Sequence, residues 1–202
     1  MIKTVIFDLG RVLIPFDFLR GYLRMQQLCG LSPDEIRARL SQDQLVRRFE
    51  TGLIENEAFV AEVSSRLGVP LEYERFCEIW SSIFLPETLI EERILEGIRR
   101  NHRTVLLSNT NGIHFSMLDA RYPILRHFDA RVLSYEVKAM KPEPEIYRAA
   151  IEAAQCAPNE CFFTDDVAAY VEAARAEGID AVQFESSEQI LEELAVRGVR
   201  WD

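Results

Sequence analysis

The chain has 202 residues, of which 48% are hydrophobic and 28% are charged. These proportions are enough to bury the core of one domain, or of one domain with an insertion, and they exclude a disordered or fibrous chain. The formal charge of −10 repels polyanions, so nucleic acid and acidic membrane surfaces are disfavoured as partners.

The start of the chain and the cysteines indicate where the protein works. Asp8 and Arg11 interrupt the first apolar run, and no cleavage site of small residues follows, so we expect no signal peptide. No window approaches 18 uncharged apolar residues, so no membrane span is predicted. The four cysteines form no CxxC pair, which disfavours zinc and a disulfide framework. Free thiols favour a cytoplasmic location.

Short apolar runs that end in polar residues predict buried strands. The first run covers residues 5–7 and ends in Asp8, and further runs lie at residues 104–107, 130–133, 161–163 and 181–184. Helical patterns, with apolar residues three and four positions apart, lie between these runs at residues 90–100, 143–154, 168–176 and 188–197. This alternation predicts an α/β fold with a doubly wound parallel sheet and helices on both faces.

The segment from about residue 16 to residue 85 breaks the alternation, because it contains almost only helical signals. Ser32 precedes a proline and two acidic residues, which is typical of a helix N-terminus. A second amphipathic helix is predicted over residues 55–67, closed by Gly68, and a third over residues 71–84. We therefore expect a helical insertion, whose aromatic residues form a small core of its own: Phe49, Phe59 and Trp80.

Polar side chains follow the predicted strands. Because the carboxyl ends of the strands in a doubly wound sheet meet at one edge, we expect these side chains to converge. Carboxylate oxygens without cysteine or histidine are hard ligands, which Mg²⁺ prefers when a substrate phosphate completes its octahedron. The sequence therefore predicts an anion site with a Mg²⁺ ion, built from Asp8, Ser108, Asn109, Thr110, Asn111, Lys141, Asp165 and Asp166.

Taken singly, each of these residues also has an ordinary structural interpretation. An aspartate at a strand end commonly caps a turn, and Lys141 before a proline is commonly a solvated loop residue. Their order along one chain favours a functional site instead. Four segments resemble, in order, the four motifs of the haloacid dehalogenase (HAD) superfamily: Phe-Asp-Leu-Gly-Arg-Val-Leu at 7–13, Leu-Ser-Asn-Thr at 107–110, Lys-Pro-Glu-Pro-Glu-Ile-Tyr at 141–147 and Phe-Thr-Asp-Asp at 163–166.

The resemblance spans essentially the whole chain and implies its organisation. A Rossmann-like core would consist of residues 1–15 and 86–202, and residues 16–85 would form a helical C1-type cap. The Asp-Leu-Gly opening is similar to small sugar-phosphate phosphatases of this superfamily. The implied activity is Mg²⁺-dependent hydrolysis of a small phosphorylated metabolite.

The resemblance also implies a role for each motif residue. Asp8 resembles the nucleophile that attacks phosphorus and forms an aspartyl phosphate, which water then hydrolyses. Ser108 and Asn109 would donate hydrogen bonds to the phosphoryl oxygens, and Lys141 would neutralise both the phosphate and Asp8. The implied metal residues are Asp8, the carbonyl of Gly10, Asp166 and Asp165, with Asp166 as a direct ligand and Asp165 as its partner, bound to the metal either directly or through another ligand.

Two positions depart from the family pattern. Most phosphatases of the superfamily have an aspartate two residues after the nucleophile as the general acid, where this chain has Gly10. General acid catalysis contributes about 10²–10⁴-fold, so the enzyme is slow, its leaving group needs little help, or another group donates the proton. A sugar 1-phosphate fits the second case, because its anomeric oxygen leaves readily. Tyr170 stands where many relatives have Asp or Asn, which predicts a lower metal affinity.

Gly10 carries two further expectations. A positive φ in its loop would explain the absence of a side chain. If another residue donates the proton, His114 and Arg11 are the next candidates, although we expect the three histidines to be structural or at the surface.

Two other functions remain open. A 2-haloacid dehalogenase of the same superfamily also lacks the acid, but it needs no metal and has no use for the pair Asp165 and Asp166. A catalytically weak phosphate-binding or regulatory protein is the second alternative, supported by Gly10 alone. The sequence predicts neither the substrate nor the oligomeric state.

Overall fold

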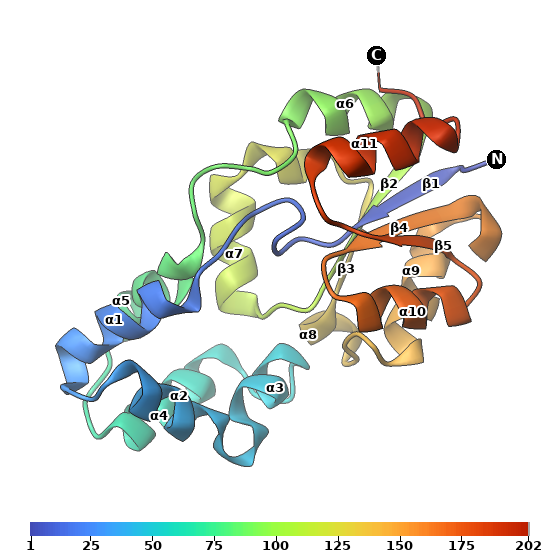
Figure 1. The fold of residues 1–202 in the computed structure, drawn as a ribbon. Helices are drawn as coiled ribbons and strands as arrows, with labels where there is room; N and C mark the ends of the chain where they lie inside the picture. The colour runs from blue at the N-terminus through green and yellow to red at the C-terminus, as the bar shows by residue number, and fades with distance from the viewer. Residues whose placement is uncertain (202) are drawn as a thin grey trace.

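The computed structural model describes residues 1–201 and contains a five-stranded sheet in the order β3-β2-β1-β4-β5 (Figure 1). Every neighbouring pair of strands is parallel. The α/β fold predicted from the alternating pattern is therefore confirmed. The strands are β1 (Thr4–Phe7), β2 (Arg103–Ser108), β3 (Ala130–Leu133), β4 (Cys161–Asp165) and β5 (Asp180–Gln183).

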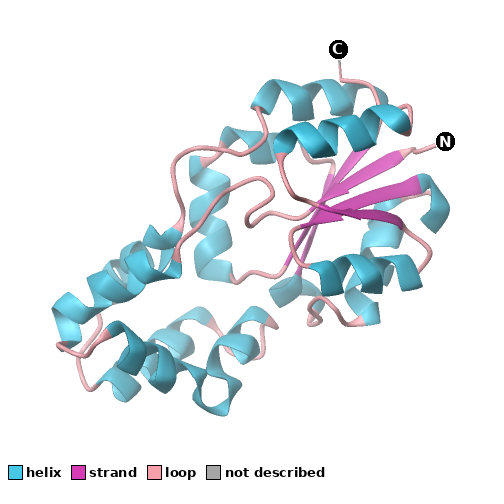
Figure 2. Cartoon of the chain, in the orientation of Figure 1, coloured by secondary structure: helices cyan, strands magenta, loops and turns pink. Residues whose placement is uncertain are grey.

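Helices cover both faces of the sheet (Figures 1 and 2). Successive strand residues point to opposite faces, so Val5 and Phe7 of β1 belong to one apolar cluster and Ile6 to another. The first face is covered by α6 (Glu92–Asn101), α7 (Gly112–Arg121) and α11 (Ser187–Val196). The second face is covered by α9 (Pro144–Ala154) and α10 (Ala168–Ala176).

Five helices lie between β1 and α6 and form a group apart from the sheet (Figure 2). They are α1 (Phe18–Cys29), α2 (Pro33–Ser41), α3 (Leu45–Glu50), α4 (Asn56–Leu67) and α5 (Tyr73–Trp80). We refer to this group as the cap. The sequence boundaries of 16 and 85 for this domain stay a prediction. A β-bridge between Phe16 and Phe84 brings the two connections to the sheet together.

The cap has its own apolar core, as the aromatic residues of the sequence predicted. Phe49 stacks on Phe59 with ring centroids 3.9 Å apart, and both side chains are buried. Trp80 is partly buried, packs against Phe59 at 5.2 Å and also stacks on His114 of α7. Trp80 therefore belongs both to the cap core and to the contact between the cap and α7.

Some predicted boundaries were wrong. The predicted strand at residues 181–184 begins one residue earlier, at Asp180. The helix expected over residues 71–84 ends at Trp80 and continues as a 3₁₀ turn over Ser81–Ile83. In residues 1–201 no helix is both long and apolar enough to cross a bilayer.

Candidate active site

Lys141 lies at the centre of a buried cluster at the carboxyl ends of the strands. Its ammonium group is 2.6 Å from Oδ1 of Asp8, which follows β1, and 2.5 Å from Oδ2 of Asp165, the last residue of β4. The same ammonium donates a hydrogen bond to the carbonyl of Leu107 in β2 at 3.2 Å. One side chain thus joins three neighbouring strands, and the predicted convergence of Asp8, Lys141 and Asp165 is observed.

The two adjacent aspartates have different surroundings. Asp165 is buried, and its second oxygen accepts a hydrogen bond from the backbone N–H of Val167 at 2.9 Å. Both oxygens of Asp165 are therefore already bonded. Asp166 is less buried and lines a surface pocket together with Arg11. Asp166 is accordingly the carboxylate more available to a ligand, while Asp165 orients Lys141.

In the cluster around Lys141, the one ammonium group does not balance the charges of the carboxyl groups. Burial raises the pKa of Asp8 to about 7, against the opposing effect of the Lys141 charge. Burial, and then the neighbouring charge of Asp165, also raise the pKa of Asp166. Burial alone would lower the pKa of Lys141, but Asp8 and Asp165 raise it above its ordinary value. Lys141 therefore stays charged, and a further cation would stabilise the carboxylates.

The carboxyl groups at the strand ends fit a divalent metal ion. Asp8, Asp165 and Asp166 each have an oxygen atom within 4.8 Å of the others. Asp8 and Asp166 are the better direct ligands, because both oxygens of Asp165 are already bonded. The donor set contains only carboxylates, which is the chemistry that hard cations prefer. The site thus combines suitable donors with the excess negative charge that a divalent cation neutralises.

The β2 loop supplies the polar groups beside Asp8. Ser108 is buried at the end of β2 and lines a cavity together with Gly10. Asn109 uses its side chain differently: its Oδ1 accepts from the backbone N–H of Lys141 at 2.8 Å, and its Nδ2 donates to the Lys141 carbonyl at 3.0 Å. The side-chain amide of Asn109 therefore holds the backbone of Lys141 in place. The hydrogen bond to the phosphate that was predicted for Asn109 would instead come from its backbone N–H.

Gly10 lacks a side chain for a reason other than the expected one. Its φ lies outside the left-handed region, whereas the next residue, Arg11, has φ 59°. The expectation of a positive φ at Gly10 was wrong. A Cβ atom on Gly10 would lie 2.7 Å from Cε1 of Phe16, so the aromatic ring occupies the space of a side chain. The Arg11 guanidinium lies over the same ring, 4.8 Å from its centroid.

The cap closes the cavity that begins at Ser108 and Gly10. Its wall includes Glu50, the last residue of α3, and His114 of α7. These two residues also line an adjoining cavity of about 390 Å³ inside the cap, together with mainly apolar residues and Arg37. We call the first space the phosphate-side cavity and the second the cap cavity. Glu50 and His114 lie where the two spaces adjoin.

His114 is held in a neutral form. Burial lowers the pKa of His114 to about 4. Its Nε2 lies 3.0 Å from the carbonyl of Trp80, and its Nδ1 lies 3.1 Å from Nδ2 of Asn111. A carbonyl only accepts and an amide nitrogen only donates, so the proton is on Nε2. Both ring nitrogens are bonded, and the expected structural role of His114 agrees with this geometry.

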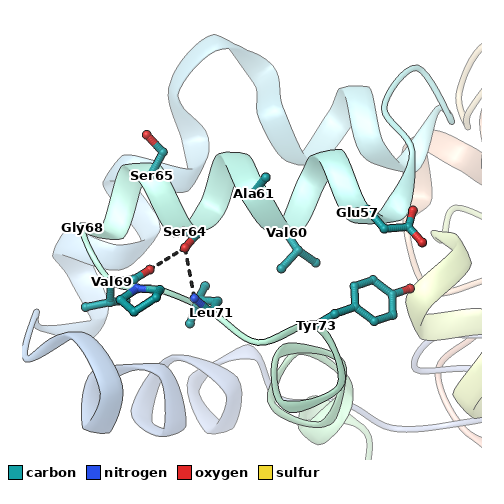
Figure 3. Close-up of a pocket in the computed structure, with 10 residues that line it drawn as sticks. Glu57, Val60, Ala61, Ser64, Ser65, Gly68, Val69, Leu71 and Tyr73 are labelled. Carbon is teal, nitrogen blue, oxygen red and sulfur yellow. Dashed lines mark hydrogen bonds between the residues drawn. The ribbon is translucent and has the colours of Figure 1, made fainter.

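A further open pocket lies on the outer surface of the cap, between α4 and the start of α5 (Figure 3). Its wall includes Glu57, Val60 and Tyr73, and Ser64 hydrogen-bonds to the backbone of Leu71 at its edge. The pocket shares no residue with the phosphate-side cavity or the cap cavity. It lacks the convergent charged groups of the strand ends, so we assign it no part in the chemistry.

The fold and site together define the class of protein. The chain belongs to the haloacid dehalogenase-like hydrolases, whose family model matches residues 2–178. The four motifs that carried the resemblance all lie within this range. The sequence-based assignment to this superfamily, and with it the assignment as a hydrolase, is confirmed.

Two relatives and one solved structure are similar to this chain over most of its length. The chain is 26% identical over 203 residues to the D-ribitol-5-phosphate phosphatase of Bacteroides thetaiotaomicron, covering 97% of this chain and 98% of that protein. It is 28% identical over 200 residues to a phosphatase of Mycobacterium tuberculosis, covering 93% and 89%. A solved structure of a HAD family enzyme from Bacteroides thetaiotaomicron, in complex with magnesium and inorganic phosphate, superposes with a TM-score of 0.84 at 29% identity, covering 93% and 96%. These similarities include the cap.

Two residues of the site were not found from the sequence. Glu50 reaches the phosphate-side cavity from the cap, and Phe16 occupies the space beside Gly10. Glu50 looks like any glutamate at the end of a short polar helix, and Phe16 like one of several phenylalanines in its segment. Neither carries a signal in the sequence pattern, because their positions depend on contacts between distant segments.

Proposed function

We propose that this protein is a Mg²⁺-dependent phosphatase that hydrolyses a small phosphorylated metabolite through an aspartyl phosphate on Asp8. The observation that carries the proposal is the buried Lys141 ammonium between Asp8 and Asp165, beside the more accessible carboxylate of Asp166. The phosphatase relatives, and the magnesium and phosphate in the solved structure, support it.

Each residue has a defined task in this reaction. Asp8, kept close to Lys141, attacks the phosphorus atom, and the lysine charge reduces the repulsion between two anions. Ser108 and the backbone of Asn109 donate hydrogen bonds to the phosphoryl oxygens. A Mg²⁺ ion held by Asp8, Asp166 and the Gly10 carbonyl would neutralise and orient the phosphate. Water then cleaves the aspartyl phosphate and restores Asp8.

We propose a sugar 1-phosphate as the substrate. The side chain missing at Gly10 has two possible consequences, a leaving group that departs readily or a proton donor from another element, and the first points to this ester because an anomeric oxygen leaves readily. The cap cavity of about 390 Å³ adjoins the phosphate-side cavity and offers room for the alcohol part. Because its lining is mainly apolar, a substrate panel must also include phosphates with apolar groups.

The expected partner is thus a small phosphorylated metabolite. The charge of −10 is the basis for expecting neither nucleic acid nor acidic membranes as partners. The cytoplasmic location also stays a prediction, based on four cysteines that are free thiols in the structure.

The dehalogenase alternative is less well supported. Asp166 has no task in a metal-independent dehalogenation, yet its carboxylate lies at the mouth of the site. The regulatory alternative was supported only by the missing side chain at Gly10. The Phe16 ring, which leaves no room for a side chain there, explains the glycine by packing instead. The phosphatase therefore accounts for more of the site than either alternative.

The test is phosphate release from a panel of sugar, polyol and apolar phosphate esters, with Mg²⁺ or with a chelator. We expect Mg²⁺-dependent turnover by the wild type and none above background for Asp8→Asn, because an amide is not a nucleophile of this kind. Asp34→Asn, at an exposed position in α2, is the matched control and should keep wild-type activity. Inactivity across the panel, with halide release from 2-haloacids, would reverse the assignment.

A further inference from the structure

The proposed reaction lacks a residue that protonates the leaving oxygen. Gly10 has no side chain, and Phe16 leaves no room for one. A donor must therefore reach the phosphate-side cavity from another element. Of the residues that line this cavity, Glu50 and His114 are the two with ionisable side chains.

His114 and Arg11 do not meet the requirement. The Nε2 proton of His114 is directed at the Trp80 carbonyl, and Nδ1 accepts from Asn111, so the ring has no free proton to give. Arg11 carries a guanidinium group, which is not suited to the role of proton donor in a protein. It also lies over the Phe16 ring and lines the pocket beside Asp166, not the phosphate-side cavity.

We propose that Glu50, at the C-terminal end of α3 in the cap, donates the proton to the leaving oxygen in place of the missing aspartate. This inference rests on the phosphatase function proposed above. Glu50 lines both the phosphate-side cavity and the cap cavity, so it lies where the space beside Ser108 adjoins the space proposed for the leaving alcohol. It is partly exposed, toward these spaces, and no other described residue forms a hydrogen bond with its carboxyl group.

A serine fixes Glu50 to the loop that follows β2. The hydroxyl of Ser134 accepts a hydrogen bond from the backbone N–H of Thr110 at 2.9 Å and donates one to the carbonyl of Glu50 at 2.6 Å. Thr110 comes directly after Ser108 and Asn109. Ser134 therefore joins the backbone of Glu50 to Thr110, which is next to the groups proposed to bind the phosphate.

The charges around Glu50 leave it able to hold a proton near neutral pH. Burial raises the pKa of Glu50 to about 7, although Arg47, one turn earlier in α3, opposes this. Arg47 is itself paired with Glu143, at the start of α9. Arg37 and the neutral His114 line the same cap cavity, and Tyr170 of α10 lies close enough for the Glu50 charge to affect it. A carboxyl group that titrates near the working pH is an effective general acid.

The proton and charge balance of the step is complete. A carboxylate oxygen of Asp8 forms a bond to phosphorus, and the bond from phosphorus to the leaving oxygen breaks with its electron pair on that oxygen. The leaving oxygen takes the proton of Glu50 and departs as an alcohol. In the second step the Glu50 carboxylate takes a proton from the attacking water, phosphate leaves, and Asp8 is restored. No other reactant is required.

The decisive variant is Glu50→Gln, which keeps the size of the side chain and removes its proton. For an alkyl phosphate we expect kcat/KM to fall by about 10²-fold or more, as for the loss of a general acid. For 4-nitrophenyl phosphate, whose leaving group needs no proton, we expect a change of less than about threefold. With the alkyl phosphate, the wild-type kcat/KM should also fall above pH 7, and this fall should be absent from Glu50→Gln.

Glu57→Gln is the matched control, since Glu57 lines the outer pocket of the cap (Figure 3) and is not among the residues that line the two cavities. An equal loss of rate on both substrates would show that Glu50 only positions other groups and would overturn the proposal. Wild-type rates for Glu50→Gln would also overturn the role of Glu50. If Asp8→Asn is inactive in the same assay, the proposed phosphatase function would still stand. A wild type without Mg²⁺-dependent turnover overturns both. If Glu50→Gln does not fold, Glu50→Asp is measured and must retain the fall above pH 7.

Discussion

His114 is a residue whose environment makes the stability of the fold depend on pH. It is 6% exposed and bonded through both ring nitrogens to the backbone of Trp80 and the side chain of Asn111. A protonated ring would place a charge among apolar groups and lose the bond in which Nδ1 accepts. Burial therefore holds the pKa of His114 at about 4, below the ordinary value of 6.5.

The first prediction concerns this pH dependence. Between pH 6.5 and pH 4, His114 binds a proton in the unfolded chain but not in the folded chain. The free energy of unfolding therefore decreases as the pH falls through this range. At pH 5 the loss should be about 2 kcal/mol, at about 1.4 kcal/mol per pKa unit. Urea unfolding of the wild type and of His114→Gln at pH 7.5 and pH 5 measures it. The difference in free energy of unfolding between the two proteins should shrink at pH 5, and a constant difference would contradict the interpretation.

In the loop after β1, an aromatic ring occupies the space that a side chain at position 10 would need. Phe16 makes edge-to-face contacts with Phe18 at 5.0 Å and Phe84 at 6.0 Å, so three aromatic rings join both connections between the sheet and the cap. The ring edge of Phe16 lies against Gly10. An aspartate at position 10 would have to displace this aromatic cluster.

The second prediction follows from that contact. Gly10→Asp should lower the free energy of unfolding by about 1–3 kcal/mol, as in other overpacked sites. The cost of the same change should be smaller in a Phe16→Ala background, because the atom 2.7 Å from the new Cβ is gone. Denaturant unfolding of the wild type, both single variants and the double variant forms the required cycle. Equal costs in the two backgrounds would show that Phe16 is not the obstacle.

The same double variant bears on catalysis. If the carboxyl group introduced by Gly10→Asp can reach the leaving oxygen once the ring is removed, it should restore part of the alkyl phosphatase activity that Glu50→Gln loses. The triple variant, compared with Phe16→Ala/Glu50→Gln, measures this gain in kcat/KM. No gain in a folded triple variant would indicate that position 10 does not face the leaving group in this protein.

Elements differ in how well the sequence predicted them. The strands and α9 were predictable because their apolar spacing matches one buried surface. α1 was not, because its apolar residues do not form a buried stripe: Phe18, Leu19, Leu23 and Leu28 are all more than 40% exposed. α3 has only six residues and follows two left-handed residues, Asp43 and Gln44, so no periodic pattern can develop.

The site shows the same limit. Asp8, Lys141, Asp165 and Asp166 were predictable because parallel strands bring their carboxyl ends to one edge, whatever the details of packing. Glu50 and Phe16 were not, because each reaches the site through contacts between segments far apart in the chain. Asn109 was located correctly, but its amide bonds with the Lys141 backbone, which no local pattern indicates.

At the scale of the whole molecule, a few contacts hold the cap over the strand ends. Arg47 of α3 pairs with Glu143, and Lys138 donates a hydrogen bond to the carbonyl of Gly52 at 2.6 Å. The bond from Ser134 to Glu50 is a third polar contact. Elsewhere the cap is joined to α7 by Trp80, which stacks on His114 and accepts its hydrogen bond. The three polar contacts lie at the edge of the site, so opening them for substrate entry would have a modest cost.

The carboxylates beneath the cap act in the opposite direction. Asp8, Asp165 and Asp166 share one lysine, and burial raises the pKa of both Asp8 and Asp166. Without a metal ion these charges repel each other inside the folded protein, and unfolding separates them. A cation that binds only the folded site should therefore stabilise the whole chain by mass action.

The last prediction measures this linkage by thermal unfolding, without any substrate. At a Mg²⁺ concentration about 100 times the dissociation constant, the gain should be about 2.7 kcal/mol, or a rise in Tm of about 5–10 °C for a chain of this length. Asp166→Ala should show little rise with Mg²⁺, because one of few ligands is missing and Mg²⁺ tolerates poor geometry badly. In a chelator the same variant should melt at or above the wild-type temperature, since one repelling charge has been removed. A wild type whose Tm does not respond to Mg²⁺ would contradict the metal site, whereas an equal response in Asp166→Ala would contradict only the assignment of this ligand.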